Sequence, residues 1–250
     1  AEWNILKDYY ESVYFFDSYA LKKTNPITIE LKEIFRQSDA YFIALLNKVR
    51  ENNINTQTIK ELNSRYIPAF KPKDDEGYIT LTTHNANAFE SNQAKLEDIS
   101  EDSQIFSAEI AGDFPAYDYP TEEELELKPH AQVMFIKNDL SPGKQFYNGK
   151  IGKITRLKDE LVFVKCPSDT DEIAVGRVTW ENIKYTLNEE TKDINEEVVG
   201  SFTQVPLKLA WAITIHKSQG LTFDKVIIDA NAAFAYGQVY VALSRCRTFD

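Results

Sequence analysis

The sequence has few residues that could cross-link the chain or bind a metal. Its two cysteines, Cys166 and Cys246, stand far apart and form no CxxC pair. A disulfide framework is therefore excluded, and a reducing compartment is indicated. The three histidines, His84, His130 and His216, show no HExxH or other ligand spacing, so we predict no structural metal site.

Long hydrophobic runs are also missing. No run approaches the ~18 apolar residues that a membrane span needs, so no membrane partner is expected. The N-terminal sequence AEWNILKDYYESVYFF has no initiator Met and no basic-then-apolar signal design. We expect the middle of a longer protein, cytoplasmic if bacterial and nuclear or mitochondrial if eukaryotic.

The chain lacks the net positive charge that nucleic-acid binders usually carry, since its formal charge is −11. However, the negative charge is concentrated in one segment of the chain. Residues 96–130 hold eleven Asp or Glu and one Lys, whereas residues 137–158 hold six Lys or Arg and one Asp. We interpret the acidic run as a solvated face; the alternative is a face that repels misdirected duplex or contacts a partner. A basic patch can coexist with it.

The most informative stretch is Leu209–Thr248. Its first part has helical apolar spacing and ends at Gly220, which predicts a helix with a glycine stop. A β-branched run, Lys225–Asp229, predicts a buried strand. A second helical stripe follows, formed by Val239, Ala242, Leu243 and Cys246. By spacing alone, each piece is an amphipathic element with a few surface polar groups.

The polar residues of this stretch carry a resemblance. TIHKSQG, followed by a strand and then QVYVALSRCRT, resembles motifs V and VI of superfamily 1 helicases. Within that superfamily the stretch is similar to group B, the 5′-to-3′ Pif/RecD-like helicases, and specifically to the Pif-one type. The two motifs occur in order and at a helicase-like separation.

An upstream segment, LKEIFRQSDAYFIALLNKVR, resembles helicase motif IV. Asp39 is a good N-cap for a helix whose apolar positions are Phe42, Leu45, Leu46 and Val49. The resemblance implies that Arg36 reaches the γ-phosphate of a bound nucleotide. The alternative is a surface ion pair of Arg36 with Glu33 or Asp39.

A strand at Tyr78–Thr82 is predicted to run into a helix that ends near Leu96. The junction LTTHNANAFESN resembles a family segment, TTHN, whose side chains lie along single-stranded DNA. The resemblance implies DNA contacts for Thr83, His84 and Asn85. A helix N-terminus is also a ready phosphate site, although the same residues serve as ordinary caps.

Residues 130–187 predict a small β-barrel of short strands separated by turn residues. The expected strands are Gln132–Lys137, Ile151–Leu157, Leu161–Lys165 and Ile173–Val178. The sequence QVMFIKND…YNGKIGKI resembles the Src-homology-3-like insert of Pif-one-type helicases. The Glu-rich residues 188–200 are predicted to be an exposed return connection.

Some helicase motifs are absent. No GxxxxGK[ST] phosphate loop occurs, because the nearest match, Gly143 to Lys150, has the wrong spacing and is followed by Ile151. The acidic Walker B pair and motif III are also missing. The resemblance therefore implies the second RecA-like domain alone, with ATP and Mg²⁺ bound mainly by a first RecA-like domain outside this chain.

The expected fold class is α/β: a RecA-like (P-loop NTPase type) parallel sheet flanked by helices, with an inserted small all-β Src-homology-3-like barrel. The RecA-like domain would comprise residues 1–129 and 198–250, and the barrel residues 130–197. The resemblance implies the C-terminal motor half of an ATP-dependent 5′-to-3′ DNA helicase, inactive as an ATPase by itself. The alternative is a non-catalytic nucleic-acid-binding or protein-interaction module.

The resemblance also assigns roles and partners. Arg36 and Arg245 would be catalytic, with Gln219, Gly220 and Gln238 at the ATP site. DNA-side residues of motif V would be Thr214, His216, Lys217 and Ser218. The implied partners are single-stranded DNA, DNA junctions and the first RecA-like domain of the same protein, and we expect a monomer.

Overall fold

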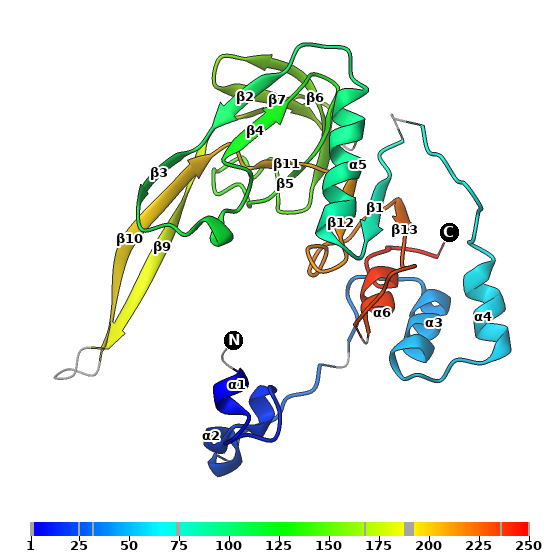
Figure 1. Ribbon diagram of the computed structural model, residues 1–250. Coiled ribbons are helices and arrows are strands. Elements are labelled where there is room, and N and C mark those ends of the chain that lie inside the picture. The colour runs from blue at the N-terminus through cyan, green and yellow to red at the C-terminus, as the bar shows by residue number, and fades with distance from the viewer. Residues whose placement is uncertain are drawn as a thin grey trace. The chain divides into compact units, whose positions relative to one another are not determined.

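The computed structural model describes residues 3–24, 26–31, 33–73, 76–167, 169–187, 193–235 and 237–249 (Figure 1). The chain forms two units, Ala1–Phe35 and Arg36–Asp250. The described part of the first unit contains three short helices: α1 (Trp3–Leu6), η1 (Phe15–Asp17) and α2 (Tyr19–Lys23). All of the predicted site residues belong to the second unit.

A parallel sheet lies at the centre of the predicted site. Its strands are β1 (Ile79–Thr82), β12 (Ala212–Thr214) and β13 (Val226–Ile228), in the order β12-β1-β13. β1 and β13 confirm two predicted strands. Ile79, Leu81 and Ile213 are buried in one core cluster with Ala242 of α6 (Gln238–Leu243), which explains the β-branched, apolar sequences of these strands.

The predicted helix at 209–220 is wrong. β11 (Leu207–Leu209) and β12 occupy its first half, and a turn occupies the second. Ala210, Ala212, Ile213 and Ile215 are all buried because β12 lies inside the structure. A short strand covered on both faces reads as a continuous apolar run, which periodicity alone does not separate from a buried helix. Gly220 is needed for its positive φ of 84°, but it closes a turn.

The helices of the second unit follow their capping signals. Asp39 accepts hydrogen bonds from Tyr41 N and Phe42 N at 2.9 and 3.2 Å, so it caps α3 (Ala40–Arg50) as predicted. α4 spans Thr56–Asn63, and α5, which spans Asn85–Glu97, leaves directly from the end of β1. In Figure 1, α5 lies along β1 and β12.

An antiparallel sheet forms the largest core. Its order is β11-β5-β6-β7-β8, with β5 (Gln132–Phe135), β6 (Ile151–Lys158), β7 (Leu161–Lys165) and β8 (Ile173–Val175). These strands confirm the four predicted ones to within a few residues. β2 (Gln104–Ser107) pairs with β4 (Glu124–Leu127), and their Phe106, Leu125 and Leu127 enter the same core.

A long ribbon extends from this core. β9 (Val178–Leu187) pairs antiparallel with β10 (Ile194–Gln204), which also pairs with β3 (Glu109–Gly112). The predicted connection at 188–200 is thus wrong for 194–200, while 188–192 lie outside the described residues. Residues 194–198 are all exposed, so no apolar alternation marks this part of the strand. The predicted boundary between 197 and 198 falls inside β10.

The acidic stretch 96–130 is folded, with short strands, a 3₁₀ turn η2 (Ala116–Asp118) and buried apolar side chains. All of its carboxylate residues except Glu126 are exposed. The negative charge is therefore carried by solvated side chains above an ordinary apolar core.

Candidate nucleotide and nucleic-acid interface

Two predicted DNA-binding segments leave the parallel sheet at the same edge. β1 ends at Thr82 and β12 ends at Thr214, and these two residues are partners in the parallel register. Ile215 N then donates to Thr82 O at 2.8 Å, which keeps the two chain segments together beyond the strands. The carboxyl edge of a parallel sheet is where α/β proteins bind their ligands.

The first segment is the junction between β1 and α5. Thr83 is buried, and its Oγ1 lies 2.7 Å from Nδ1 of His84. His84 occupies the N-cap of α5 but makes no side-chain cap hydrogen bond, and Asn85 is exposed in the first turn. The first N–H groups of α5 are thus not capped by this side chain, as an anion site at a helix N-terminus requires.

Thr82 was missed by the sequence interpretation. Its side chain is 3% exposed, and its Oγ1 is the one buried side-chain polar atom without a hydrogen-bond partner among the described residues. Buried polar atoms are nearly always satisfied. The sequence could have indicated Thr82, because it is the first threonine of the TTHN segment.

The second segment is the turn after β12. Thr214 and Ser218 point inward: Thr214 Oγ1 accepts from Lys217 N at 3.3 Å, and the fully buried Ser218 donates from Oγ to Ile215 O at 2.7 Å. His216 and Lys217 are exposed. The structure therefore divides the four predicted residues into two that build the turn and two that face outward.

Arg245 follows the end of α6 and is only 7% exposed. Its Nε donates to Val241 O at 2.9 Å, and Nη2 donates to Ser244 Oγ at 2.7 Å. Nη1 donates to the carbonyls of Ser218 and Leu221 at 3.4 and 3.3 Å. The guanidinium is thus held against the turn that carries His216 and Lys217.

Arg36 contacts the same segment. Its Nε donates to Thr222 Oγ1 at 3.1 Å, whereas its alternative partner Asp39 caps α3. Burial lowers the pKa of Arg245, and the nearby positive charge of Arg36 lowers it further. Two guanidinium groups that repel each other at one place are the arrangement expected of an anion site.

Gln37 is a further residue that the sequence interpretation missed. Its Nε2 donates to Ser244 O and Cys246 O, the carbonyls on either side of Arg245, and the residue is 5% exposed. Gln219 and Gly220 are exposed in the turn, between Ser218 and Leu221, whose carbonyls accept from Arg245. Motif IV, the motif V turn and the end of α6 therefore form one hydrogen-bonded unit.

Gln238 lies at the start of α6 and is 6% exposed. Its Oε1 accepts a hydrogen bond from Phe234 N at 3.1 Å. The ring of Phe234 in turn lies 5.3 Å from the imidazole of His84, centroid to centroid. Gln238 is thus connected through one residue to the β1–α5 junction.

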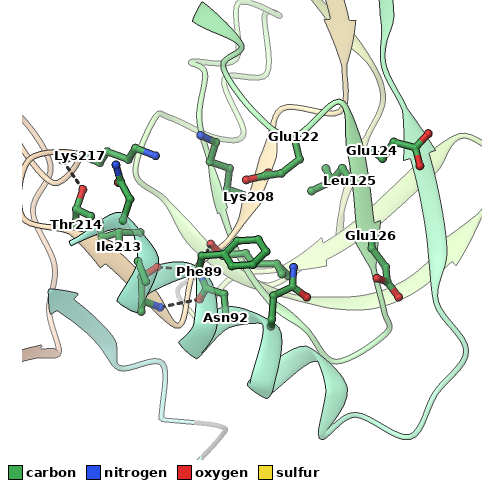
Figure 2. Close-up of a pocket in the computed structure, with 15 residues that line it drawn as sticks. Phe89, Asn92, Glu122, Glu124, Leu125, Glu126, Lys208, Ile213, Thr214 and Lys217 are labelled. Carbon is green, nitrogen blue, oxygen red and sulfur yellow. Dashed lines mark hydrogen bonds between the residues drawn. The ribbon is translucent and has the colours of Figure 1, made fainter. Parts of the chain in front are cut away.

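A cleft of about 300 Å³ opens beside these segments, between α5, β4 and β11 (Figure 2). Asn85, Thr214 and Lys217 line it together with Lys208 and Phe89, which the sequence interpretation did not select. Lys208 carried a signal, because it is a lysine within the apolar sequence PLKLAWA.

Other site chemistries lack support in this structure. Burial raises the pKa of both cysteine thiols to about 11, so neither is a ready thiolate.

Within the described residues, no three His, Cys, Asp or Glu side chains gather as a metal site would require. Among the same residues, no helix combines the length and apolarity needed to cross a membrane. Lys150, from the false phosphate loop, forms an ion pair with Asp169 at 2.6 Å.

A family model and curated proteins match this chain. The UvrD-like helicase C-terminal domain model matches residues 209–248. The ATP-dependent DNA helicase PIF1 of Rattus norvegicus is 33% identical over 244 residues, covering 94% of this chain and 36% of that protein. The chain thus spans about a third of the length of such curated relatives.

Solved structures match over nearly the whole chain. The crystal structure of Bacteroides sp Pif1 in complex with ADP-AlF4 is 39% identical with a TM-score of 0.85, covering 98% of this chain and 56% of that one. Bacteroides Pif1 bound to ssDNA is also 39% identical, with a TM-score of 0.65 and coverage of 99% and 56%. The mixed α/β fold, with its parallel and antiparallel sheets, matches these structures. The chain belongs to the Pif1 family of DNA helicases, as a region homologous to about a third to a half of its full-length members.

Proposed function

We propose that this chain is the second motor domain of an ATP-dependent 5′-to-3′ DNA helicase. The observation that carries the proposal is the convergence of Arg36 and Arg245 on one turn, residues 218–222. His216 and Lys217 come directly before these residues in the chain. Both are exposed, next to the β1–α5 junction. A nucleotide contact and a DNA contact on one turn are what a motor needs to couple the two.

The arginines would act on the γ-phosphate of ATP. Phosphoryl transfer is catalysed mostly by positioning and charge stabilisation, and a trans-acting arginine contributes roughly 10³–10⁵ in rate. The mutual repulsion of Arg36 and Arg245 fits an anion bound between them. Gln219 and Gly220 would approach the nucleotide from the same turn, and Gln238 would support the arginines.

ATP and Mg²⁺ would be held mainly by a first RecA-like domain, because this chain has no phosphate loop. When bound between the two domains, Mg²⁺ would neutralise charge on the phosphates. The part assigned to this chain is the arginine side of that site. The isolated chain is therefore expected to hydrolyse no ATP.

Single-stranded DNA would lie along the carboxyl edge of the parallel sheet. Thr83, His84 and Asn85 would contact it from the β1–α5 junction, and His216 and Lys217 from the motif V turn. Thr83, Thr214 and Ser218 are buried in this structure, so their proposed DNA role rests on the family resemblance. Contacts to phosphates make such binding largely independent of sequence and sensitive to salt.

The domain organisation proposed for this function has a RecA-like part, residues 1–129 and 198–250, and an insert, residues 130–197, that forms a small Src-homology-3-like barrel. Strands β5 to β8 lie within the insert, and β11, which completes their sheet, lies outside it. The lysines of 137–158 would let the insert touch the DNA backbone. The protein would act as a monomer on single strands and DNA junctions. A related structure is described as showing DNA unwinding at forked dsDNA by two coordinating Pif1 helicases, which supports the junction partner but not the monomer.

The proposal is tested on the full-length protein that contains this chain. We expect DNA-stimulated ATP hydrolysis and unwinding of 5′-tailed but not 3′-tailed duplexes, with no turnover by the isolated 250-residue chain. DNA-stimulated hydrolysis by the isolated chain would contradict the proposal. A full-length protein that binds DNA without ATP turnover would instead indicate the non-catalytic binding module.

A further inference from the structure

The cleft between α5, β4 and β11 contains a cation that none of the assigned roles uses. Lys208 extends from β11 into the cleft, and its ammonium group points toward that of Lys217 (Figure 2). No ion pair or hydrogen bond of the Lys208 ammonium is found among the described residues. Its nearest charges are Glu122 and Lys217.

Lys208 is in an unfavourable position for an isolated cation. Burial lowers its pKa from the ordinary lysine value, Glu122 partly offsets this, and Lys217 lowers it further. Glu122 thus offsets part, but not all, of the cost of this half-buried charge and of its repulsion by Lys217. An anion between the two ammonium groups would remove both penalties, and a DNA phosphate has this chemistry.

Carboxylates line the cleft as well, and that of Glu122 lies beside Lys208 (Figure 2). Glu122 is held by Thr121, whose Oγ1 lies 2.9 Å from its Oε2 and 2.8 Å from Leu207 O. Glu124 and Glu126 of β4 line the cleft farther from Lys208 (Figure 2). Lys208 and Lys217 thus lie at one end of the cleft, where Glu122 adds a carboxylate, and two more carboxylates line the other end.

An aromatic ring lies between these ends. Phe89 of α5 is 59% exposed and lies across the cleft (Figure 2). One turn later, Asn92 exchanges hydrogen bonds with Ala212, from Nδ2 to O and from N to Oδ1, both at 2.9 Å. The helix that presents Phe89 is therefore fixed to β12, and a fixed aromatic face suits base stacking.

We propose that this cleft is a subsite for one nucleotide of single-stranded DNA, in which Lys208 and Lys217 hold a phosphate, Phe89 stacks on the base and Glu122 accepts a hydrogen bond from the base. This rests on the proposed DNA-binding surface and adds a base preference to it. Cytosine presents an N4 amino donor where thymine and uracil present an O4 acceptor. A carboxylate accepts from the former and repels the latter.

The test measures binding of the 250-residue chain to fluorescent (dC)n and (dU)n of about eight nucleotides, a length within the usual site size of such folds. These strands differ in base edge but not in backbone or ring size. The chain is expected to bind (dC)n more tightly. Glu122→Gln should bring the ratio toward one, whereas Glu196→Gln, exposed on β10, should leave it unchanged.

Two further variants test the phosphate and the stack. Lys208→Met should reduce the slope of log affinity against log salt by about 0.7, the value for one phosphate contact to a single strand. Lys208→Arg should restore the slope, and Lys60→Met, exposed on α4, should not change it. Phe89→Ala should weaken binding about 5- to 150-fold for both strands. Melting curves identify any variant that fails to fold.

The outcomes separate this inference from the proposed function. If the chain binds single strands but Lys208→Met matches Lys60→Met and Glu122→Gln keeps the wild-type ratio, the nucleotide subsite is wrong and the wider DNA surface stands. If the folded chain binds no single strand at low salt, the DNA-binding surface is wrong and the subsite with it.

Discussion

The side-chain amide of Gln37 donates hydrogen bonds to the backbone carbonyls of Ser244 and Cys246, at 2.9 and 3.0 Å. Gln37 follows Arg36 directly, and the two carbonyls flank Arg245. One buried amide therefore fixes the distance between the two segments that carry the proposed catalytic arginines. The positions of Arg36 and Arg245 are not independent of each other.

Gln37→Ala is expected to destabilise the chain by about 1–3 kcal/mol, because two buried carbonyls lose their donor. The measurement is urea unfolding of the 250-residue chain. Gln57→Ala is a matched control, since Gln57 is exposed and its amide donates to Glu61 one turn away; a change within about 0.5 kcal/mol is expected. Equal effects of the two substitutions on the free energy of unfolding would show that the Gln37 hydrogen bonds do not stabilise the chain.

Arg245→Ala in the full-length protein is expected to lower ATP turnover by about 10³–10⁵-fold and to leave single-strand affinity nearly unchanged. Arg247→Ala is the control, because Arg247 is exposed two residues later and pairs with Asp224 at 3.0 Å. Since Arg245 also bonds to the carbonyls of Ser218 and Leu221, folding is verified by circular dichroism. Lost DNA binding with normal ATP turnover would show that Arg245 serves DNA binding and not ATP hydrolysis.

The sequence predicted well those elements whose signals are local. Asp39 was identified as a cap because capping depends on the next three residues, and the strands around Ile79 and Ile227 were found from β-branched runs. The segment 209–220 failed because its environment is not local. Its strand is buried between neighbours from elsewhere in the chain, and an apolar run does not reveal whether it is covered as a helix or as a strand.

The site was predicted in part for the same reason. Residue types at motif positions named the arginines and the TTHN segment, but not which side chains face outward. Ser218 was expected on the DNA side, and it is fully buried. Gln37 and Lys208 gain their importance from partners more than 100 residues away or across a cleft, which no single-sequence pattern reports.

Replacing Thr83 with Val and Asn85 with Ala is expected to weaken single-strand binding and to leave its salt dependence nearly unchanged. Both side chains are neutral, and the slope of log affinity against log salt reports phosphates neutralised by Lys and Arg. Fluorescence anisotropy at several salt concentrations measures this directly. Asn53→Ala, exposed beyond the end of α3, serves as the control. An unchanged affinity would show that these residues only shape the start of α5.

Asn92→Asp provides a test with a defined pH dependence. In the folded chain, Asn92 Nδ2 donates to Ala212 O and Oδ1 accepts from Ala212 N. A protonated Asp can make both contacts, whereas an ionised Asp places negative charge against a carbonyl oxygen. The folded-state pKa of the new carboxyl is therefore expected above its unfolded value of about 3.9.

A raised carboxyl pKa means that the folded state binds more protons, so stability is lost as pH rises. Compared with wild type, Asn92→Asp should be least destabilised below about pH 4 and progressively more destabilised toward pH 7. Urea unfolding of both proteins at several pH values measures the difference. Asn53→Asp, which is exposed, should show no such trend. A pH-independent difference for Asn92→Asp would mean that the donor contact to Ala212 O contributes little to stability.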